Sequence, residues 1–303
     1  MLFSSVFKAQ TEKEAFCVPE LPEVQTIVND LDRAGLVGRT FTEAKVRWSR
    51  IIATSSPGVF CKQISGRTII SIQRRAKLIL FELDNSWTLA VHLRMTGRFQ
   101  MQEAKAPPMP HQHVILSLDD GRSLRYNDTR KFGRFYLADN KDTLLSSYGP
   151  EPLDKLFTAA VLTHRLARYH RQIKPLLLDQ RFVAGLGNIY ADEALWAARI
   201  HPMRRSDSLS DKEIKELHSC IRKVLRQGVR HAGTTLGYGQ SNFYSLGNTR
   251  GGNANHLKVF RRTNLPCPRC RTPISRILVG QRSSHICNKC QKLKPISAIL
   301  AES

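Results

Sequence analysis

Four cysteines near the C-terminus constrain the fold more tightly than any other feature of the chain. Cys267 and Cys270 form one C-x2-C pair, Cys287 and Cys290 form a second, and sixteen residues separate the pairs. Two thiolates on each of two tight turns can surround one zinc ion, and four protein ligands leave no open coordination position. A segment this short and poor in large apolar residues cannot easily hold a fold alone. The spacing therefore predicts a C-terminal zinc ribbon with one structural Zn²⁺.

The rest of the chain divides into a strand-rich part and a helix-rich part. Val24, Ile27, Val28 and Leu31 have the spacing of one amphipathic helix, which we expect from residue 22 to 31. Short apolar or alternating runs then predict strands of a β-sandwich or barrel; they cover residues 68–72, 78–83, 88–93, 114–118, 123–126 and 134–137. After residue 152, longer periods predict helices near 154–169, 175–179, 190–198 and 211–231, followed by an irregular loop at 233–255.

The charge of the chain favours a polyanionic partner. Lysine and arginine number 47 against 25 acidic residues, a formal net charge of +22. Such an excess binds phosphates through counterion release, so nucleic acid is the leading candidate, although a ribosome-associated protein would carry the same signature. No apolar run approaches the roughly 20 residues needed to cross a bilayer. We expect a cytoplasmic protein that binds no membrane.

A series of motifs from residue 19 to about residue 292 resembles, in order, the formamidopyrimidine-DNA glycosylase family. The motifs are PELPEV (19–24), QRRAK (73–77), HLRMTG (92–97), HQHV (111–114), LRYNDTRKFG (124–133), IKP (173–175), GLGNIYADEAL (185–195) and the zinc ribbon. The resemblance implies a multidomain α+β fold with an N-terminal two-layered β-sandwich, a helix-two-turns-helix domain and a C-terminal zinc-ribbon finger. The expected boundaries are 1–18 for an extension, 19–152 for the catalytic sandwich, 153–255 for the helical DNA-binding domain with a lesion loop, and 256–295 for the finger.

The resemblance also implies a bifunctional enzyme of base excision repair. Such an enzyme removes 8-oxoguanine and formamidopyrimidines from double-stranded DNA and nicks the strand by β,δ-elimination. The nucleophile would be the amine of Pro19, because an α-amino group has a reference pKa of about 7.7 to 8.0 and a secondary amine yields an iminium ion. The enzyme is expected to act as a monomer in the bacterial cytoplasm, associated with the nucleoid.

The family's functional residues carry over to this sequence by motif. Glu20 would move protons during base departure, supported by Glu23, while Lys77 and Arg282 would assist the two eliminations and contact phosphate. Extrusion of the base leaves a gap in the duplex, which an apolar wedge, a ring and a guanidinium can fill. The positions that match these inserting residues are Met95, Arg130 and Phe132, and those that match DNA-backbone contacts are His111, Lys174 and Asn188.

Two alternatives remain open at this stage. An endonuclease-eight-like glycosylase for oxidised pyrimidines shares the architecture and the proline chemistry, although Leu21 and the QRRAK motif favour the purine branch. A catalytically silent lesion-binding protein would result if residues 1–18 were retained, because an internal proline has its nitrogen in an amide. Val18 stands where the family has its initiator methionine, and a GUG codon can initiate bacterial translation as methionine.

The sequence therefore predicts a mature protein that begins at Pro19. Initiation at Val18 followed by removal of the methionine, or proteolysis after Val18, would each produce it. Intact-mass analysis of the native protein is expected to give the mass of a chain starting at Pro19. A native mass that includes residues 1–18 would contradict both routes.

Overall fold

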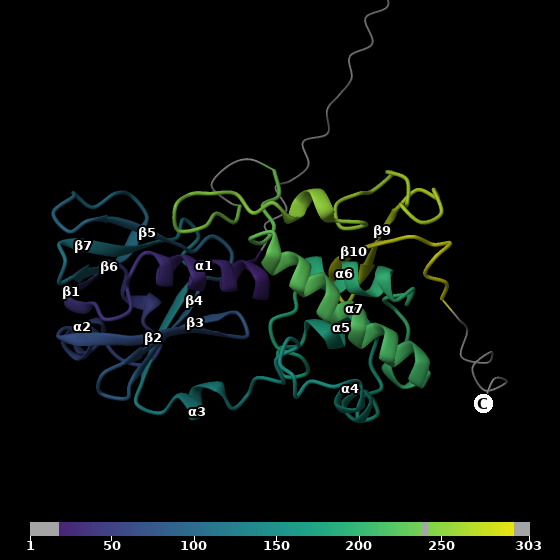
Figure 1. Cartoon of the computed structure of the whole chain (residues 1–303), viewed down its shortest axis with the longest axis horizontal. Helices are drawn as coiled ribbons and strands as arrows, with labels where there is room; N and C mark the ends of the chain where they lie inside the picture. Colours follow the sequence, from purple (N-terminus) through teal and green to yellow (C-terminus); the bar gives the residue numbers. More distant parts are fainter. Residues whose placement is uncertain (1–17, 238–241, 294–303) are drawn as a thin grey trace, which may run out of the picture.

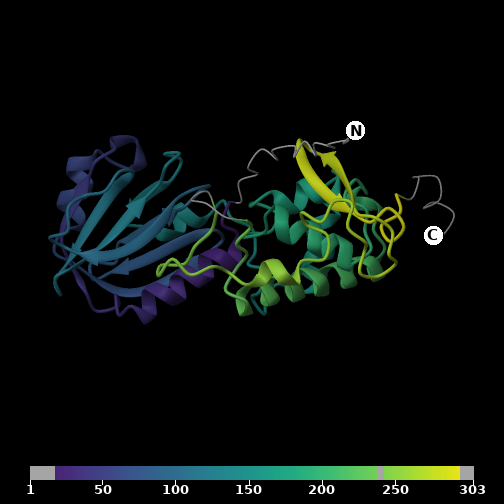
Figure 2. The same cartoon turned by 90° about the horizontal axis from the view of Figure 1, so that it is seen from above.

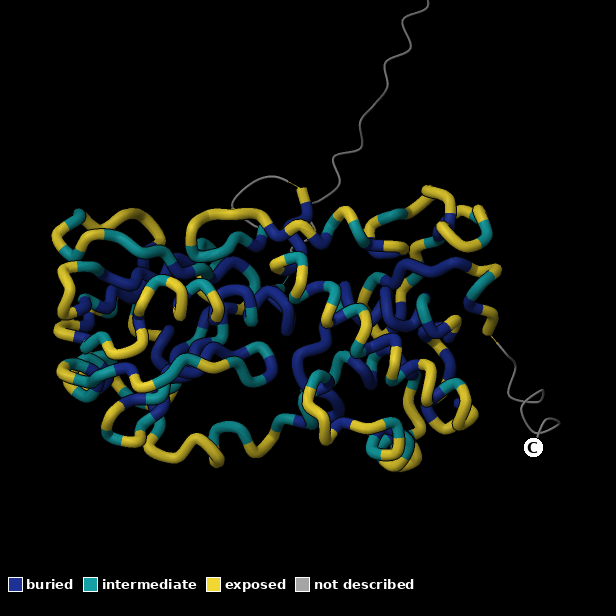
Figure 3. Tube along the Cα trace, in the orientation of Figure 1, coloured by how far each residue is buried: buried dark blue, intermediate teal, exposed yellow. Residues whose placement is uncertain are grey.

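The computed structural model describes residues 18–237 and 242–293. Of the predicted extension, all but Val18 lies outside the described residues. Figure 1 shows an elongated molecule with a strand-rich part at one end and a helical part at the other. Figure 3 shows that the buried residues lie toward the interior of each part. No helix among the described residues is long and apolar enough to span a membrane.

Helix α1 (Leu21–Arg33) joins the two parts. The helix begins after Glu20, whose backbone N–H donates to the side chain of Glu23 at 2.9 Å. Pro22 lies in the first turn, where the missing N–H costs no hydrogen bond. Val24 and Leu31 face the core of the sandwich, whereas Leu21 belongs to the core of the helical part.

The strand-rich part is a two-layered sandwich made from one bent antiparallel sheet. Its strand order is β5-β7-β6-β1-β2-β3-β4-β8, and only two residue pairs join β1 to β2, so the sheet folds over at that point. The strands are β1 (Thr40–Val46), β2 (Arg67–Arg75), β3 (Leu78–Leu83), β4 (Thr88–His92), β5 (Arg98–Glu103), β6 (Gln112–Leu118), β7 (Arg122–Asn127) and β8 (Arg134–Ala138), with helices α2 (Pro57–Ile64) and α3 (Lys141–Leu145) and the turn η1 (Ser49–Ile51).

Aromatic rings fill the space between the two layers. Phe99 of β5 makes edge-to-face contacts with Phe81, Tyr126 and Phe135, at centroid distances of 6.2, 5.5 and 6.2 Å. Edge-to-face pairs of this kind contribute beyond the area they bury. The layers are therefore held together at the point where β3 and β8 of one half face β5 and β7 of the other.

The sequence patterns located six of the eight sandwich strands and missed β1, β5 and α2. In β5 only Phe99 and Met101 are apolar and only Phe99 is fully buried, so the alternation is too short to predict a strand. In β1 a bulge between Phe41 and Glu43 shifts the register and breaks the period of two. Both strands form because they pair with adjacent strands, β1 with β6 and β5 with β7, and not because of a local sequence pattern.

The helical part follows the sandwich. Its elements are α4 (Ala159–Leu166), α5 (Ile173–Leu178), α6 (Asn188–Ala197), η2 (Ser206–Ser208), α7 (Asp211–Arg230) and η3 (Asn253–His256). The helix expected at 154–169 is shorter than predicted, because Thr158 caps its first turn by accepting from the N–H of Val161. Helix α7 begins with a capping box between Ser210 and Glu213. The expected domain boundaries stay predictions.

The finger contains one antiparallel hairpin, β9 (Ser275–Val279) and β10 (Arg282–Ile286). Gly280 and Gln281, both with positive φ, form its tip, and Arg282 follows directly. Gly280 lies against the ring of Pro175 in α5. Figure 2 shows the hairpin, in yellow, on the edge of the helical part opposite the green helix α7.

Replacement of Phe99 with alanine tests the aromatic packing. The Phe99→Ala variant should lose about 3–5 kcal/mol of unfolding free energy in urea titrations, because the ring leaves a cavity between two layers. The Phe132→Ala variant is the matched control, since the ring of Phe132 is 44% exposed, and it should change stability by less than about 0.5 kcal/mol. Equal losses in the two variants would contradict this account of the core.

Candidate functional site

Glu20 is a carboxyl group buried at the N-terminus of helix α6. Its two oxygens accept hydrogen bonds from the backbone N–H groups of Gly187 at 2.7 Å and Ile189 at 2.9 Å. A helix N-terminus favours a negative charge at this place. Burial nevertheless raises the pKa of Glu20 to about 7, against the opposing effect of Lys77. A carboxyl group with a pKa near 7 can both donate and accept a proton at neutral pH.

The close approach of α6 to Glu20 depends on Gly187. A Cβ at that position would lie 2.3 Å from the carboxyl carbon of Glu20, closer than any real contact allows. Gly185 has φ +82°, and a Cβ there would meet Leu21 at 2.8 Å. The GLG motif therefore serves the packing of α6 onto the start of α1.

Glu23 organises a buried polar network beside Glu20. Its carboxylate accepts from the hydroxyl of Tyr190 at 2.8 Å and from the backbone N–H of Thr234 at 2.7 Å. The side-chain amide of Asn253 donates to the hydroxyl of Thr234 at 2.9 Å. Burial raises the pKa of Glu23 from its usual value. The network links α1 to α6 and to both ends of the predicted lesion loop, and the sequence reasoning identified only Glu23 in it.

Lys77 lies in the turn between β2 and β3, and that turn is held by Glu151. The carboxylate of Glu151 accepts from the guanidinium of Arg74 at 2.7 Å, from that of Arg75 at 2.9 Å and from the backbone N–H of Ala76 at 2.5 Å. Burial raises the pKa of Glu151, but the two arginines outweigh it and the pKa is lowered. Glu151 therefore positions the turn that presents Lys77 to Glu20. In the sequence, Glu151 stands out only as part of a Gly-Pro-Glu-Pro turn.

Lys174 is fully buried between α5, α6 and the finger hairpin. Its ammonium group donates to Asp192 at 2.6 Å, to the backbone carbonyl of Ser283 at 2.8 Å and to the hydroxyl of Ser284 at 2.7 Å. The side-chain amide of Asn188 donates to the same Ser283 carbonyl at 3.1 Å. The predicted phosphate contact of Lys174 would require one of these hydrogen bonds to be exchanged, since an ammonium group has three donors.

The hairpin carries exposed Arg282 toward this group of charges. Burial lowers the pKa of Lys174, and the neighbouring carboxylate of Asp192 is the main opposing effect. Glu20 also raises this pKa and Arg282 also lowers it, each to a smaller extent. Three of the four predicted catalytic residues are therefore linked electrostatically. Lys77 lowers the pKa of Glu20, and Glu20 and Arg282 both affect the pKa of Lys174. The fourth, Pro19, is buried directly before Glu20. The structure brings together residues that lie more than 260 positions apart in the sequence.

The three predicted inserting residues lie on two loops of the sandwich that share one buried carboxylate. Asp128 accepts from the hydroxyl of Thr96, next to Met95. It also accepts from the backbone N–H groups of Arg130 at 3.2 Å and Gly133 at 2.8 Å. Asp128 was part of a recognised motif, but its role as the common anchor of both loops was not predicted.

The inserting side chains differ in exposure. Phe132 is 44% exposed, and the guanidinium of Arg130 lies 4.9 Å from the centre of its ring. Met95 is half-buried, and His111 is exposed just before β6. An exposed ring that stacks with a guanidinium at a loop tip suits insertion between bases.

The four predicted zinc ligands come together at one point. Their sulfur atoms all lie within 4.8 Å of one another. The sulfurs of Cys270 and Cys287 are 3.3 Å apart and those of Cys267 and Cys290 are 3.9 Å apart. Four thiolates at 2.3 Å from a central zinc would be separated by about 3.8 Å. The cluster therefore fits one tetrahedral structural Zn²⁺, which the two C-x2-C turns would hold.

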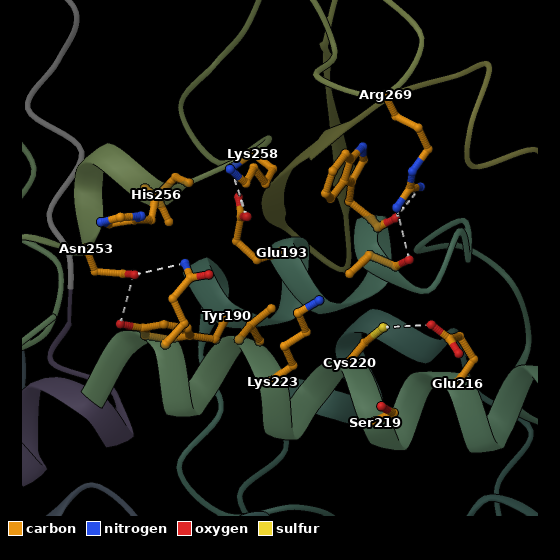
Figure 4. Close-up of a pocket in the computed structure, with 15 residues that line it drawn as sticks. Tyr190, Glu193, Glu216, Ser219, Cys220, Lys223, Asn253, His256, Lys258 and Arg269 are labelled. Atoms are coloured by element: carbon orange, nitrogen blue, oxygen red, sulfur yellow. Dashed lines mark hydrogen bonds between the residues drawn. The ribbon is translucent and has the colours of Figure 1, made fainter. Parts of the chain in front are cut away.

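A pocket of about 410 Å³ lies elsewhere, between α6, α7 and η3. Figure 4 shows Lys223 and Cys220 of α7 facing Glu193, Lys258 and Arg269 across it. Tyr190 and Asn253 of the Glu23 network reach its wall, but none of the predicted catalytic residues lines it. The pocket is thus a separate feature from the Glu20 group.

Three family models match the chain in sequence order. Residues 18–135 match the formamidopyrimidine-DNA glycosylase N-terminal domain and residues 148–239 match the H2TH domain of the same enzymes. Residues 264–293 match the zinc finger found in FPG and IleRS.

Curated relatives and solved structures agree with these matches. The formamidopyrimidine-DNA glycosylase of Protochlamydia amoebophila is 43% identical over 275 residues, which cover 91% of this chain and 100% of that protein. The one from Herpetosiphon aurantiacus is 49% identical, with coverages of 90% and 100%. A Lactococcus lactis FPG mutant bound to a Fapy-dG containing DNA is 34% identical, has a TM-score of 0.84, and is covered completely by 91% of this chain. The MutM (FPG) protein from Thermus thermophilus is 37% identical, has a TM-score of 0.81 and has the same coverages.

The buried carboxyl of Glu20 predicts a pH-dependent stability. Its pKa is 4.5 in the absence of a perturbing environment and about 7 in the folded chain. The native state holds this proton more tightly than the unfolded state, so the unfolding free energy falls as the pH rises between the two values, by roughly 3 kcal/mol. Urea titrations of the natural chain and of Glu20→Gln across this range should give curves that diverge toward higher pH, with the natural chain losing more stability. Parallel curves would contradict the raised pKa.

Proposed function

The chain belongs to the formamidopyrimidine-DNA glycosylase family and is a base excision repair glycosylase for oxidised purines, and from this premise we propose that it is also an AP lyase whose nucleophile is the amine of Pro19. The observation that carries the proposal is the position of Pro19, buried next to Glu20 with Lys77 acting on the same carboxyl. A nucleophile and a proton carrier with a pKa near 7 are thereby adjacent.

The proposed reaction begins when the unprotonated Pro19 nitrogen bonds to the sugar C1′. The bond from C1′ to the base breaks, and the base leaves with the electron pair. Glu20 transfers protons to the departing base and to the opening sugar ring. As the sugar ring opens, the C1′–O4′ bond breaks, the Pro19 nitrogen loses its proton, and its electron pair forms the C1′=N bond of an iminium ion. The iminium acidifies C2′, so loss of a C2′ proton breaks the C3′–O bond and releases the 3′ phosphate. Loss of a C4′ proton then breaks the C5′–O bond and releases the 5′ phosphate. Lys77 assists the first elimination, and Arg282 contacts phosphate during the second.

The proposed partner is double-stranded DNA that contains an oxidised base. Met95, Arg130 and Phe132 would fill the gap left by the extruded nucleotide, while His111, Lys174 and Asn188 would hold the backbone. Similar proteins whose structures were solved with Fapy-dG containing DNA or with abasic-site DNA support this choice of partner. Because Lys174 and Asn188 both donate to Ser283, DNA binding at this place would act on the hairpin that carries Arg282. A monomeric state and a nucleoid location stay predictions.

A free amine at Pro19 is the condition for this chemistry. The first family match begins at residue 18, and relatives covered over their full length leave about a tenth of this chain outside the match. These boundaries support a functional enzyme that starts at Pro19.

Borohydride trapping tests the proposal. Protein that begins at Pro19 should form a covalent adduct with a duplex containing 8-oxoguanine opposite cytosine, because borohydride reduces the iminium to a stable amine. The matched control is the same protein with residues 1–18 retained, which should bind the duplex but form no adduct. Tight binding by both forms without an adduct would favour a silent lesion-binding protein, and stronger trapping on thymine glycol would favour the pyrimidine branch.

A further inference from the structure

A second pocket, of about 510 Å³, lies between the C-terminal half of α7 and the turn η3. Five of the residues that line it are basic, namely Lys223, Arg226, Arg230, His231 and His256. The other described residues of its wall are neutral, so no acidic side chain of the described chain lines it. This basic pocket therefore has a positive potential that favours an anion.

The three longest cationic side chains of the basic pocket lack a counter-charge. The side chains of Lys223, Arg226 and Arg230 make no ion pair or hydrogen bond with any residue of 18–237 or 242–293. The partial negative charge at a helix C-terminus stabilises a cation in the last turn, where Arg230 lies, but the effect is lost before Arg226 and Lys223. The stability of α7 therefore does not account for two of these cations.

Two stacked imidazole rings complete the basic pocket. The rings of His231 and His256 lie 3.7 Å apart at an interplanar angle of 21°. The two residues flank the predicted lesion loop, and the carbonyl of His231 accepts from the backbone N–H of Gly252 at 2.8 Å. Burial lowers the pKa of His231, and the neighbouring His256 and Arg230 lower it further. An anion beside these rings would offset the repulsion among the positive groups.

The basic pocket adjoins the pocket of Figure 4. The two pockets share Ser219, Lys223, Gln227 and His256 in their walls. Figure 4 shows Lys223 directed from α7 into the space that the helix shares with η3 and α6. On the far side of these shared residues, the wall includes apolar side chains, among them Val224 and Leu257. A basic end and a partly apolar end therefore belong to one continuous binding surface.

This surface is separate from the predicted DNA contacts. None of the described residues that are predicted to act in catalysis or to bind DNA lines either pocket. Arg282 belongs to β10, and Figure 2 shows the finger hairpin on the opposite edge of the helical part from α7. The uncompensated positive charge of α7 thus lies outside the contacts of the proposed reaction.

We propose that the two adjoining pockets between α7 and η3 bind a small organic phosphate of the nucleotide class. Its phosphate groups would lie among Lys223, Arg226 and Arg230, because arginine and lysine form strong charge-assisted hydrogen bonds with phosphate oxygens. Its apolar or planar body would lie against Val224 and Leu257, where phosphate alone gains nothing.

The position of this site connects it to the predicted lesion loop. Gln227 lines both pockets, and its side-chain amide donates to the side-chain oxygen of Asn253 at 3.2 Å. Asn253 belongs to the network through which Glu23 holds both ends of that loop. A bound organic phosphate would therefore contact the two segments that flank the loop.

Calorimetric titration of the natural chain with ATP, without divalent ions, tests this inference independently of enzyme activity. The double variant Lys223→Gln and Arg226→Gln should bind ATP at least about tenfold more weakly, because it loses two charge-assisted contacts. The matched control is Lys212→Gln with Lys215→Gln, which removes two exposed charges from the same helix outside both pockets and should leave ATP binding unchanged. No ATP binding by the natural chain, or equal weakening in the two double variants, would overturn the proposal.

Two further titrations test the class of ligand and the separation from DNA. Inorganic triphosphate, which lacks an apolar body, should bind at least about tenfold more weakly than ATP. The complex of the natural chain with a duplex that contains an abasic-site analogue should bind ATP as tightly as the free chain does, since the predicted DNA contacts lie elsewhere. Equal affinities for the two phosphates, or displacement of ATP by the duplex, would contradict the assignment.

Discussion

The buried carboxylate of Glu20 at the N-terminus of α6 is the contact on which the remaining arrangement depends. It joins the first residues of the sandwich to a helix that begins 168 positions later, through backbone N–H groups of Gly187 and Ile189. The approach requires a glycine at position 187, because any Cβ would overlap the carboxyl group. Burial makes the charged form unfavourable, while the helix N-terminus and Lys77 favour it. The balance leaves a carboxyl group with a pKa of about 7 directly after Pro19 in the chain.

Helix α6 extends from this carboxyl group at its N-terminus to the cysteine cluster at its C-terminus. Near its middle, Asp192 accepts from Lys174 and from the backbone N–H of His285, which fixes the hairpin that carries Arg282. The next residue, Glu193, accepts from the backbone N–H groups of residues 258–260, which lead into the finger. At the C-terminal end of α6, the carbonyl of Trp196 accepts from Arg269 of the first C-x2-C turn. Just after the helix, the carbonyl of Ile200 accepts from Gln291, which follows the second turn. The finger is consequently fixed to α6 at several points, and a zinc ion in its cysteine cluster would help to place Arg282, the predicted phosphate contact.

Several functional contacts could not be read from the sequence because their partners are distant in the chain. Asp128 anchors two inserting loops through Thr96, a residue 32 positions away. Glu151 holds the Lys77 turn across 75 residues. Lys174 matched a DNA-backbone position, yet its ammonium group is enclosed by Asp192, Ser283 and Ser284. In each case the residue type was visible, but the partner that defines its environment was not.

The sequence by itself determined the zinc ligands, the strongly periodic helices and strands, and the family, because these depend on local spacing or on the order of motifs. It could not locate β1 and β5, whose regularity comes from their neighbours in the sheet. The tertiary structure alone decided the raised pKa of Glu20, the enclosure of Lys174 and the packing of Trp196 in the buried cluster of the finger. Desolvation and hydrogen bonding act through space, so the properties of these groups depend on residues that the chain brings to them only when it folds.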